Sequence, residues 1–180
     1  MKLNLKVYLI LIVVSFSILA FYFVARPGKN NSVTESSPVP IFASVSTDGW
    51  KNYINSDYGY SIEYPSNWYF SVVSSGTPIW VHFSPKPIPT SGVLDSPLII
   101  NFWNNQTEES TVNILRSQSP GADEKTVVVG NLMAHELYNS LGIDYIFPKG
   151  KDSIEIDTGQ NEGATWNILS TIVSTFRFTN

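Results

Sequence analysis

The longest uninterrupted apolar stretch of the chain lies close to its first residue. Residues 7–25 contain no charged side chain. A helix rises about 1.5 Å per residue, so a helix of this length nearly matches a hydrocarbon core about 30 Å thick. The stretch therefore predicts one N-terminal transmembrane helix in contact with the lipid bilayer.

A second pattern, with a period of two residues, begins after residue 50. Tyr60, Ile62 and Tyr64 alternate with polar residues until Pro65 ends the alternation, as expected for a half-buried strand. Similar short runs predict further strands at 68–73, 79–83, 98–103, 126–129, 132–138, 143–147, 153–157 and 177–178. Turn-forming residues at 130–131 and at 148–151 separate neighbouring strands of this set, and they predict two antiparallel hairpins.

Two segments have the features of helices. Residues 107–117 carry Glu108 and Glu109 at their start and Arg116 at their end, which is the charge order that the helix dipole favours. Near the C-terminus, apolar residues recur at helical spacing: Trp166, Leu169, Ile172, Val173 and Phe176. Hairpins with a few helices predict an α+β domain, in which an antiparallel sheet is flanked by helices.

These patterns divide the chain into four parts. Residues 1–6 form a short tail, 7–25 the transmembrane anchor, 26–49 a flexible linker and 50–180 one globular domain. The linker lacks periodicity, and its prolines prevent a continuous helix. The domain is long enough to bury a core of its own.

The flanks of the apolar stretch indicate its fate and its orientation. Lys2 and Lys6 precede it as in a signal sequence, but it exceeds the usual signal core of about 7–15 residues, and Phe23 disfavours cleavage after Ala25. We therefore expect an uncleaved signal-anchor in the cell membrane. The short tail is easier to leave in the cytoplasm than a folded domain, so we expect the domain to be extracytoplasmic.

Composition excludes several classes of site and partner. The chain has no cysteine and a formal net charge of −4. Disulfides, thiolate metal sites and thiol nucleophiles are thereby excluded. All of the acidic residues follow the apolar stretch, and they outnumber the basic residues. We therefore expect no nucleic-acid partner, because no basic patch is available for phosphates.

Residues 57–68, with the sequence DYGYSIEYPSNW, form the clearest local signature. The segment resembles the opening of PsbP-like domains, in which a Tyr-Gly-aromatic turn, a strand, a Tyr-Pro pair and a Trp follow one another. Residues 174–178 resemble the close of related membrane-anchored bacterial domains. The residues themselves predict a structural role, because Gly59 permits a tight turn and aromatic side chains at strand period are usually buried.

The resemblance implies an α-β-α sandwich around an antiparallel sheet. It also implies a non-catalytic accessory or protein-binding role. The best-known relative assists the oxygen-evolving complex of photosystem II, and this chain departs from it in having a predicted membrane anchor and no transit-type N-terminus.

Few residues offer catalytic chemistry. His82 and His135 each lie in a predicted strand, where a lone histidine is usually packed or hydrogen-bonded. The sequence has no nucleophile elbow, phosphate loop or dinucleotide glycine pattern. We therefore predict no catalytic residue and no cofactor.

Asp152, Glu155 and Asp157 gather on the second predicted hairpin. Glu155 and Asp157 face the same way, which would suit a calcium ion or an acid pair, and the three residues are the candidate metal ligands. No calcium-loop spacing is present, so we favour the solvent face of a strand, with Ile154 and Ile156 turned inward.

Three functional hypotheses follow. The preferred one is a single-pass, membrane-anchored binding or accessory domain whose partner is a protein at the membrane surface. The second is a hydrolase or metal-dependent enzyme that uses the acidic hairpin 152–157. The third, which comes from the resemblance alone, is a photosystem accessory subunit.

Overall fold

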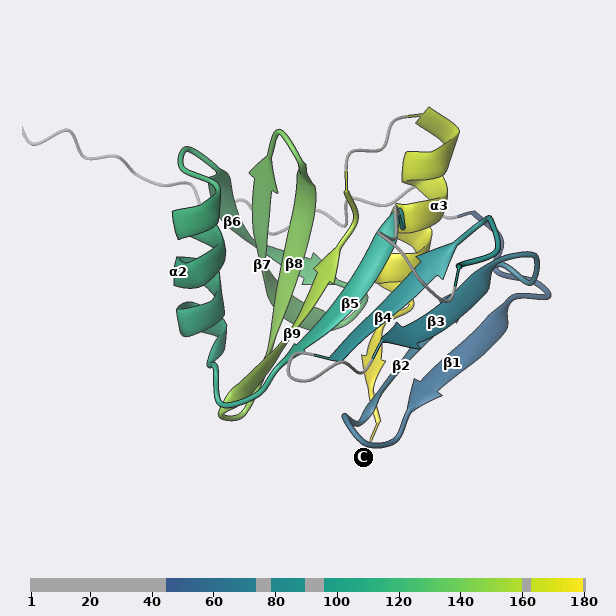
Figure 1. Ribbon diagram of the computed structural model, residues 1–180, viewed down its shortest axis with the longest axis horizontal. Helices are drawn as coiled ribbons and strands as arrows, with labels where there is room; N and C mark the ends of the chain where they lie inside the picture. The colour runs from purple at the N-terminus through teal and green to yellow at the C-terminus, as the bar shows by residue number, and fades with distance from the viewer. Residues whose placement is uncertain (1–44, 74–78, 90–95, 160–162, 180) are drawn as a thin grey trace, which may run out of the picture. The chain divides into compact units, whose positions relative to one another are not determined.

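The computed structural model describes residues 45–73, 79–89, 96–159 and 163–179 of the chain. Within these residues the chain forms two antiparallel sheets and two helices (Figure 1). The predicted α+β class is therefore confirmed.

Seven strands form the larger sheet, in the order β3-β4-β5-β9-β8-β7-β6. Their bounds are Tyr69–Val73 for β3, Ile79–Ser84 for β4, Leu98–Trp103 for β5, Asp123–Val129 for β6, Leu132–Asn139 for β7, Gly142–Lys149 for β8 and Asp152–Asp157 for β9. Both predicted hairpins are present, as β6–β7 and β8–β9. Strand β9 is the central strand of the sheet, and it pairs with β5 on one side and with β8 on the other.

Three strands form the smaller sheet, in the order β1-β2-β10. They span Lys51–Asn55, Tyr60–Tyr64 and Arg177–Phe178. Strand β1 was absent from the predicted set, because its sequence KNYIN has neither a clear alternation nor an apolar run. Its pairing with β2 along all five residues supplies the order that its local sequence lacks.

Helix α2 spans Glu108–Gln118, within one residue of the predicted 107–117. Thr107 caps it, because the Thr107 hydroxyl accepts a hydrogen bond from the Ser110 N–H at 3.3 Å. On the sheet side, Val112 packs against Leu137 of β7 and Ile146 of β8. These contacts fix α2 on one face of the larger sheet.

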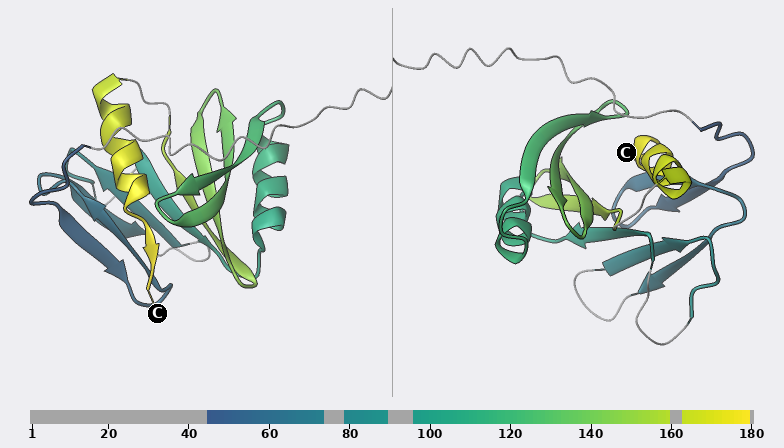
Figure 2. Two further views of the ribbon diagram at one scale, coloured as in Figure 1. Left: turned by 180° about the vertical axis from the view of Figure 1, so that it is seen from behind. Right: turned by 90° about the horizontal axis from the view of Figure 1, so that it is seen from above.

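Helix α3 spans Gly163–Ser174 and packs on the opposite face. Its residues Leu169, Ile172 and Val173 are 0% exposed. Just beyond the helix, the ring of Phe176 lies 4.5 Å from that of Phe147 in β8. The two helices thus lie on opposite sides of the larger sheet (Figure 2), in the α-β-α arrangement that the resemblance implies.

The side chains of the PsbP-like signature belong to the core. Tyr60, Ile62 and Tyr64 are at most 5% exposed and join the main core cluster with α3 and both sheets. Burial of three large side chains on one strand face contributes several kcal/mol, at about 1.5–3 kcal/mol for each apolar side chain. The expected structural role of this strand is therefore confirmed.

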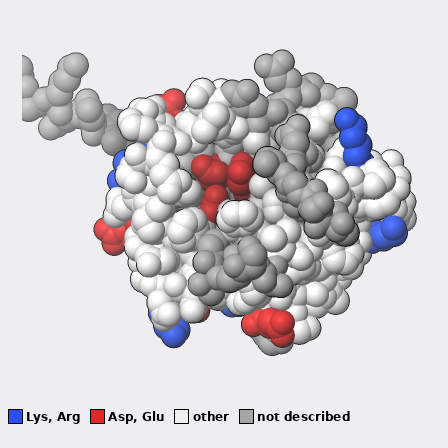
Figure 3. Space-filling model, in the orientation of Figure 1, with Lys and Arg blue, Asp and Glu red and all other residues white. Residues whose placement is uncertain are grey.

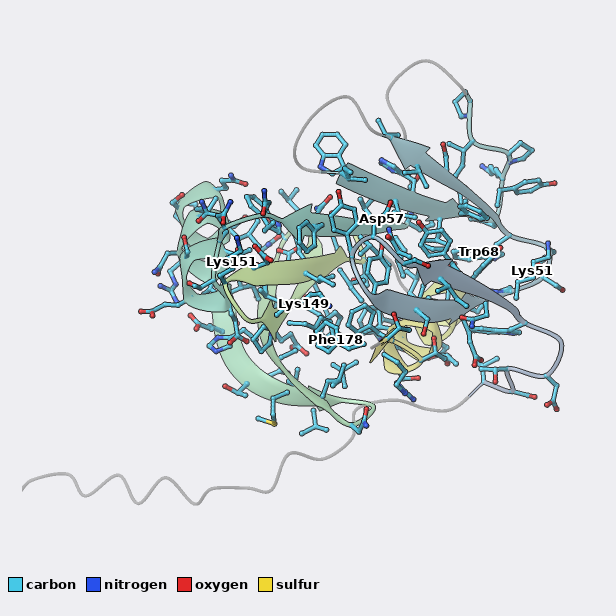
Figure 4. All side chains as sticks on the ribbon, turned by 90° about the horizontal axis from the view of Figure 1, so that it is seen from below. Lys51, Asp57, Trp68, Lys149, Lys151 and Phe178 are labelled. Atoms are coloured by element: carbon cyan, nitrogen blue, oxygen red, sulfur yellow. The ribbon has the colours of Figure 1, made fainter. Side chains whose placement is uncertain are left out.

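The turn before β2 is held by the end of the chain. The Gly59 carbonyl accepts hydrogen bonds from the Thr179 N–H at 3.0 Å and from Lys149 Nζ at 3.2 Å. Lys149 Nζ also lies 4.7 Å from the ring centre of Phe178, and the two side chains are seen together in Figure 4. The turn of the signature therefore ties β2 to β8 and β10.

The predicted anchor, 7–25, and most of the predicted linker lie outside the described residues. Among the residues that the structure does describe, no helix is both long enough and apolar enough to cross a membrane. Residues 45–49, at the end of the linker, are described, and the Val45 N–H donates to Thr171 Oγ1 of α3 at 3.3 Å. The chain thus contacts α3 before it enters β1.

Candidate functional site

Antiparallel register gathers polar side chains on the face of the larger sheet that carries α2. Residues that stand opposite each other in neighbouring strands project from the same face. One row across the sheet contains His82, Ile99, Asp157, Asp144 and Leu137, in the strand order β4-β5-β9-β8-β7. The adjacent row contains Trp80, Asn101, Glu155, Ile146 and His135. Because α2 packs on the Leu137 and Ile146 end of these rows, the carboxyl groups lie beside the helix, at the middle of the sheet.

Glu155 is the most enclosed of these carboxyl groups, with 4% of the residue exposed. Its Oε2 accepts hydrogen bonds from Asn101 Nδ2 at 3.1 Å and from Trp103 Nε1 at 2.5 Å. Asp157 and Asp144 are half-buried, and Asp157 Oδ1 accepts from the Gly159 N–H at 2.7 Å. Figure 3 shows acidic side chains gathered in a recess at the middle of this face, and we call the recess lined by Asp144, Glu155 and Asp157 the acidic recess.

The acidic recess strongly disfavours negative charge. Burial, followed by the charges of Glu155 and Asp157, raises the pKa of Asp144 from 3.8 to about 8. Burial likewise raises the pKa of Glu155 to about 7, although hydrogen bonds from Trp103 and Asn101 oppose that rise. Burial also raises the pKa of Asp157. The carboxyl groups therefore hold protons between them near neutral pH.

No basic side chain neutralises the acidic recess in the described part of the chain. The ion pairs there join Arg116, Lys125 or His135 to other carboxylates, and none includes a carboxylate of the recess. Gathering like charges in a partly buried place lowers stability unless a counter-charge is supplied. Clusters of this kind are candidates for functional sites.

His82 is a second polar group that lacks a partner on this face. The residue is 4% exposed, and both ring nitrogens are buried with no hydrogen-bond partner among the described residues. Burial lowers its pKa, which keeps the ring neutral at neutral pH. Asn101 Oδ1, beside Glu155, is also buried without a partner in the described ranges.

Two indole side chains flank the polar rows. Trp80 stands opposite Asn101 and is 43% exposed, and its ring meets that of His82 edge to face, with centroids 6.2 Å apart. Trp103 follows Asn101 by two residues in β5, so it projects from the same face. The recess thus combines acceptor groups with aromatic surface.

The carboxyl groups do not form a metal site as they stand. Among the described residues, no three acidic or histidine side chains are grouped so that they could hold one metal ion. Of the three predicted metal candidates, Asp152 projects from the other face of β9, and its Oδ1 accepts from the Asn105 N–H at 2.7 Å. Asp152 therefore has a structural contact and does not line the recess.

Two further charged clusters have partners of their own. His135 lies 3.1 Å from Glu124 and 3.9 Å from Glu108, and Arg116 also pairs with Glu124. On the opposite face, Lys125 lies 2.8 Å from Glu136. Because their charges are compensated, these clusters offer less reason for a ligand than the acidic recess.

The sequence-based predictions for this hairpin were partly right. Ile154 and Ile156 are fully buried, and Glu155 and Asp157 share a face, as expected. The favoured solvent-exposed position of that face is wrong, because β9 lies at the centre of the sheet and Glu155 is buried. Asp144 was missed, although counting back from the turn of the β8–β9 hairpin places it opposite Asp157.

Comparison with known proteins gives fold similarity alone. No family model matches the chain, and no curated protein matches it. Similar solved structures include a protein from Bacteroides thetaiotaomicron VPI-5482, with a TM-score of 0.48 and 13% identity over 72% of this chain and 48% of that one. This chain thus spans about half the length of the Bacteroides protein.

Another similar structure is cyanobacterial PsbP (CyanoP) from Synechocystis sp. PCC 6803. Its TM-score is 0.43 and its identity 13%, over 78% of this chain and 99% of that one. PsbP is the family that residues 57–68 resemble, and the similarity concerns the fold alone.

Proposed function

We propose that this chain is a binding or accessory domain without catalytic activity, tethered to the outer side of a cell membrane by residues 7–25. The acidic recess is its binding site, and its natural partner is at the membrane surface. The observation that carries the binding role is the recess itself, where Asp144, Glu155 and Asp157 lie together without a counter-charge among the described residues.

Three features support this proposal. The apolar stretch has the length and the lack of charge of a membrane-spanning helix. The accessory role is the one that the resemblance of residues 57–68 to PsbP-like domains implies. A ligand that brings positive charge would relieve the repulsion among the carboxylates of the recess. Relief of this repulsion would contribute to the free energy of binding.

The tether predicts how the chain fractionates. We expect the full chain to remain in the membrane pellet after a carbonate wash, because the apolar helix is held by lipid. We also expect protease added outside intact cells to digest the domain. A chain that lacks residues 1–25 is the control and should stay soluble. Release of the full chain by carbonate, or protection of its domain from outside protease, would disprove this arrangement.

A hydrolase is the second candidate, and one observation favours it. The pKa of Glu155 is raised to about 7 and that of Asp144 to about 8, which is the range of a general acid that works at neutral pH. A proton held there could be donated to a leaving group.

A binding domain and a hydrolase differ in whether they turn over a substrate. As a binding domain, the purified full chain should hydrolyse none of a panel of chromogenic esters and glycosides. If it does turn over a substrate, E155Q should lower kcat by about a hundredfold when Glu155 is the acid. The matched control is E109Q, because Glu109 is exposed and lies on α2. Turnover that E155Q abolishes and E109Q retains would replace the binding proposal with the enzymatic one.

A further inference from the structure

We propose that the acidic recess binds an organic cation, a guanidinium or alkylammonium group, beside the indoles of Trp80 and Trp103. The inference rests on the proposed binding function and names the chemistry of the ligand. It follows from the charge of the recess, the kind of hydrogen-bonding groups left unpartnered there and the surfaces that flank them.

Once its carboxyl groups ionise, at about pH 7 to 8, the recess carries negative charge and favours a cation. The carboxylates of Glu155 and Asp157 are close enough to repel that of Asp144. No described basic side chain forms an ion pair with any of the three. A cation that enters a partly buried site interacts with these carboxylates far more strongly than it would in bulk water. An anion would add to the existing repulsion.

The unpartnered groups all offer hydrogen-bond acceptors. Neutral His82 presents one acceptor nitrogen, and it is 4% exposed with neither ring nitrogen bonded to a described residue. Its side chain stands in the same cross-strand row as Asp157 and Asp144. Asn101 Oδ1 is a further buried acceptor, directly beside Glu155. A ligand rich in N–H donors would satisfy these acceptors together with the carboxylates.

The spacing of the acceptors favours an extended cation over a metal ion. The described acidic and histidine side chains do not converge on one point where an ion would sit. A guanidinium group is planar, carries five N–H donors and stacks on aromatic rings, so it can reach separate acceptors at once. Trp80 and Trp103 project from the same face and supply the aromatic surface for such a contact.

A guanidinium or ammonium group has two natural sources. It can belong to a free small molecule or to an arginine or lysine side chain of a partner protein. We therefore compare agmatine with a blocked pentapeptide that has arginine between glycines. The same peptide with citrulline in place of arginine is the uncharged control, because citrulline has nearly the same shape.

The test titrates the full chain, purified in a mild detergent, with each probe by calorimetry at pH 8. We expect saturable binding of at least one cationic probe. Affinity for the citrulline peptide should be at least about tenfold lower than for the arginine peptide, because a tenfold change is about 1.4 kcal/mol and one charge contact near a protein surface exceeds that. Tighter binding of agmatine would identify a free cation as the ligand, and tighter binding of the peptide would identify a partner's side chain.

Variants locate the binding in the recess. E155Q and D157N should each weaken the cationic probe about tenfold, whereas E109Q removes one exposed charge elsewhere and should leave the affinity unchanged. Near-ultraviolet circular dichroism confirms that each variant is folded. Measurable and equal affinity for the citrulline and arginine peptides would overturn the inference while leaving a binding role for the recess. Absence of saturable binding by both cationic probes would also overturn the inference. Neither outcome would bear on the membrane tether, which the fractionation experiment tests separately.

Discussion

The domain is expected to lose stability as the pH rises from 6.5 to 8.5. Its free energy of unfolding should fall by about 2 kcal/mol over this interval, because one retained proton changes stability by about 1.4 kcal/mol per pH unit. The cause is the acidic recess, where the pKa of Asp144 is raised to about 8 and that of Glu155 to about 7. Most small domains reach maximal stability somewhere between pH 5 and 8, so a steady fall through this range is a distinctive result.

The sign follows from where each carboxyl group holds its proton. In the unfolded chain, Asp144 and Glu155 lose their protons near 3.8 and 4.5. In the folded chain, they keep them until about pH 8 and about pH 7. Between these values the folded state binds more protons than the unfolded state, so its stability decreases as the pH rises. Asp157, whose pKa is also raised, acts in the same direction.

His82 acts in the opposite direction at lower pH. Burial lowers its pKa below 6.5, so the unfolded chain binds the extra proton and stability rises with pH up to about that value. The interval from pH 6.5 to 8.5 therefore isolates the carboxyl groups. The other described ionisable groups on this face or on α2 are Tyr69, Glu108, Glu109, Arg116, Glu124 and His135.

Urea unfolding of the full chain in mild detergent, followed by tryptophan fluorescence at several pH values, measures this dependence. D144N should be more stable than the parent at pH 8.5 and should show a flatter profile, because the amide carries no charge to repel its neighbours. E109Q, which changes an exposed carboxyl group, should follow the parent profile. A parent protein equally stable at pH 6.5 and pH 8.5 would show that the carboxyl groups are not held protonated by the fold.

Local patterns predicted the elements of this fold well, because the elements reflect local rules. The alternation of Tyr60, Ile62 and Tyr64 matches β2, and the charge order of 107–117 matches α2 within one residue. The turn signal at 130–131 gave the β6–β7 hairpin. Each of these predictions needed only residues close together in the chain.

The acidic recess could not be predicted in the same way, because it depends on the order of strands in the sheet. Glu155 is buried since β9 pairs with β5, whose residue Asn101 lies 54 positions earlier. Periodicity assigns Glu155 to one face of a strand but does not tell whether that strand is central or at an edge. His82 enters the same row only because β4 pairs with β5. Long-range pairing therefore created the site, and it reversed the expected exposure of Glu155.

Among the described glycines, Gly142 is the one whose substitution should be most damaging, because the β8–β9 hairpin brings its Cα against the backbone that follows β9. Gly142 begins β8 with a φ of +148°, and a Cβ placed on it would lie 2.5 Å from the carbonyl carbon and oxygen of Gly159. These obstructing atoms are backbone atoms just beyond β9, so they cannot rotate away as a side chain would. We therefore expect G142A to lower the free energy of unfolding by about 3 kcal/mol or more, through backbone strain and overpacking together.

The control for this substitution is G150A, in the turn between β8 and β9. Gly150 also has a positive φ, +66°, but a Cβ there would meet nothing within 4 Å, so G150A should cost about 1 kcal/mol from strain alone. Urea unfolding at pH 6.5 compares the two variants with the parent. Because the Gly159 N–H donates to Asp157, any folded G142A protein should also bind the cationic probes more weakly, as the displaced backbone moves Asp157. Equal stability of the two variants would contradict the close approach of the Gly142 and Gly159 backbones.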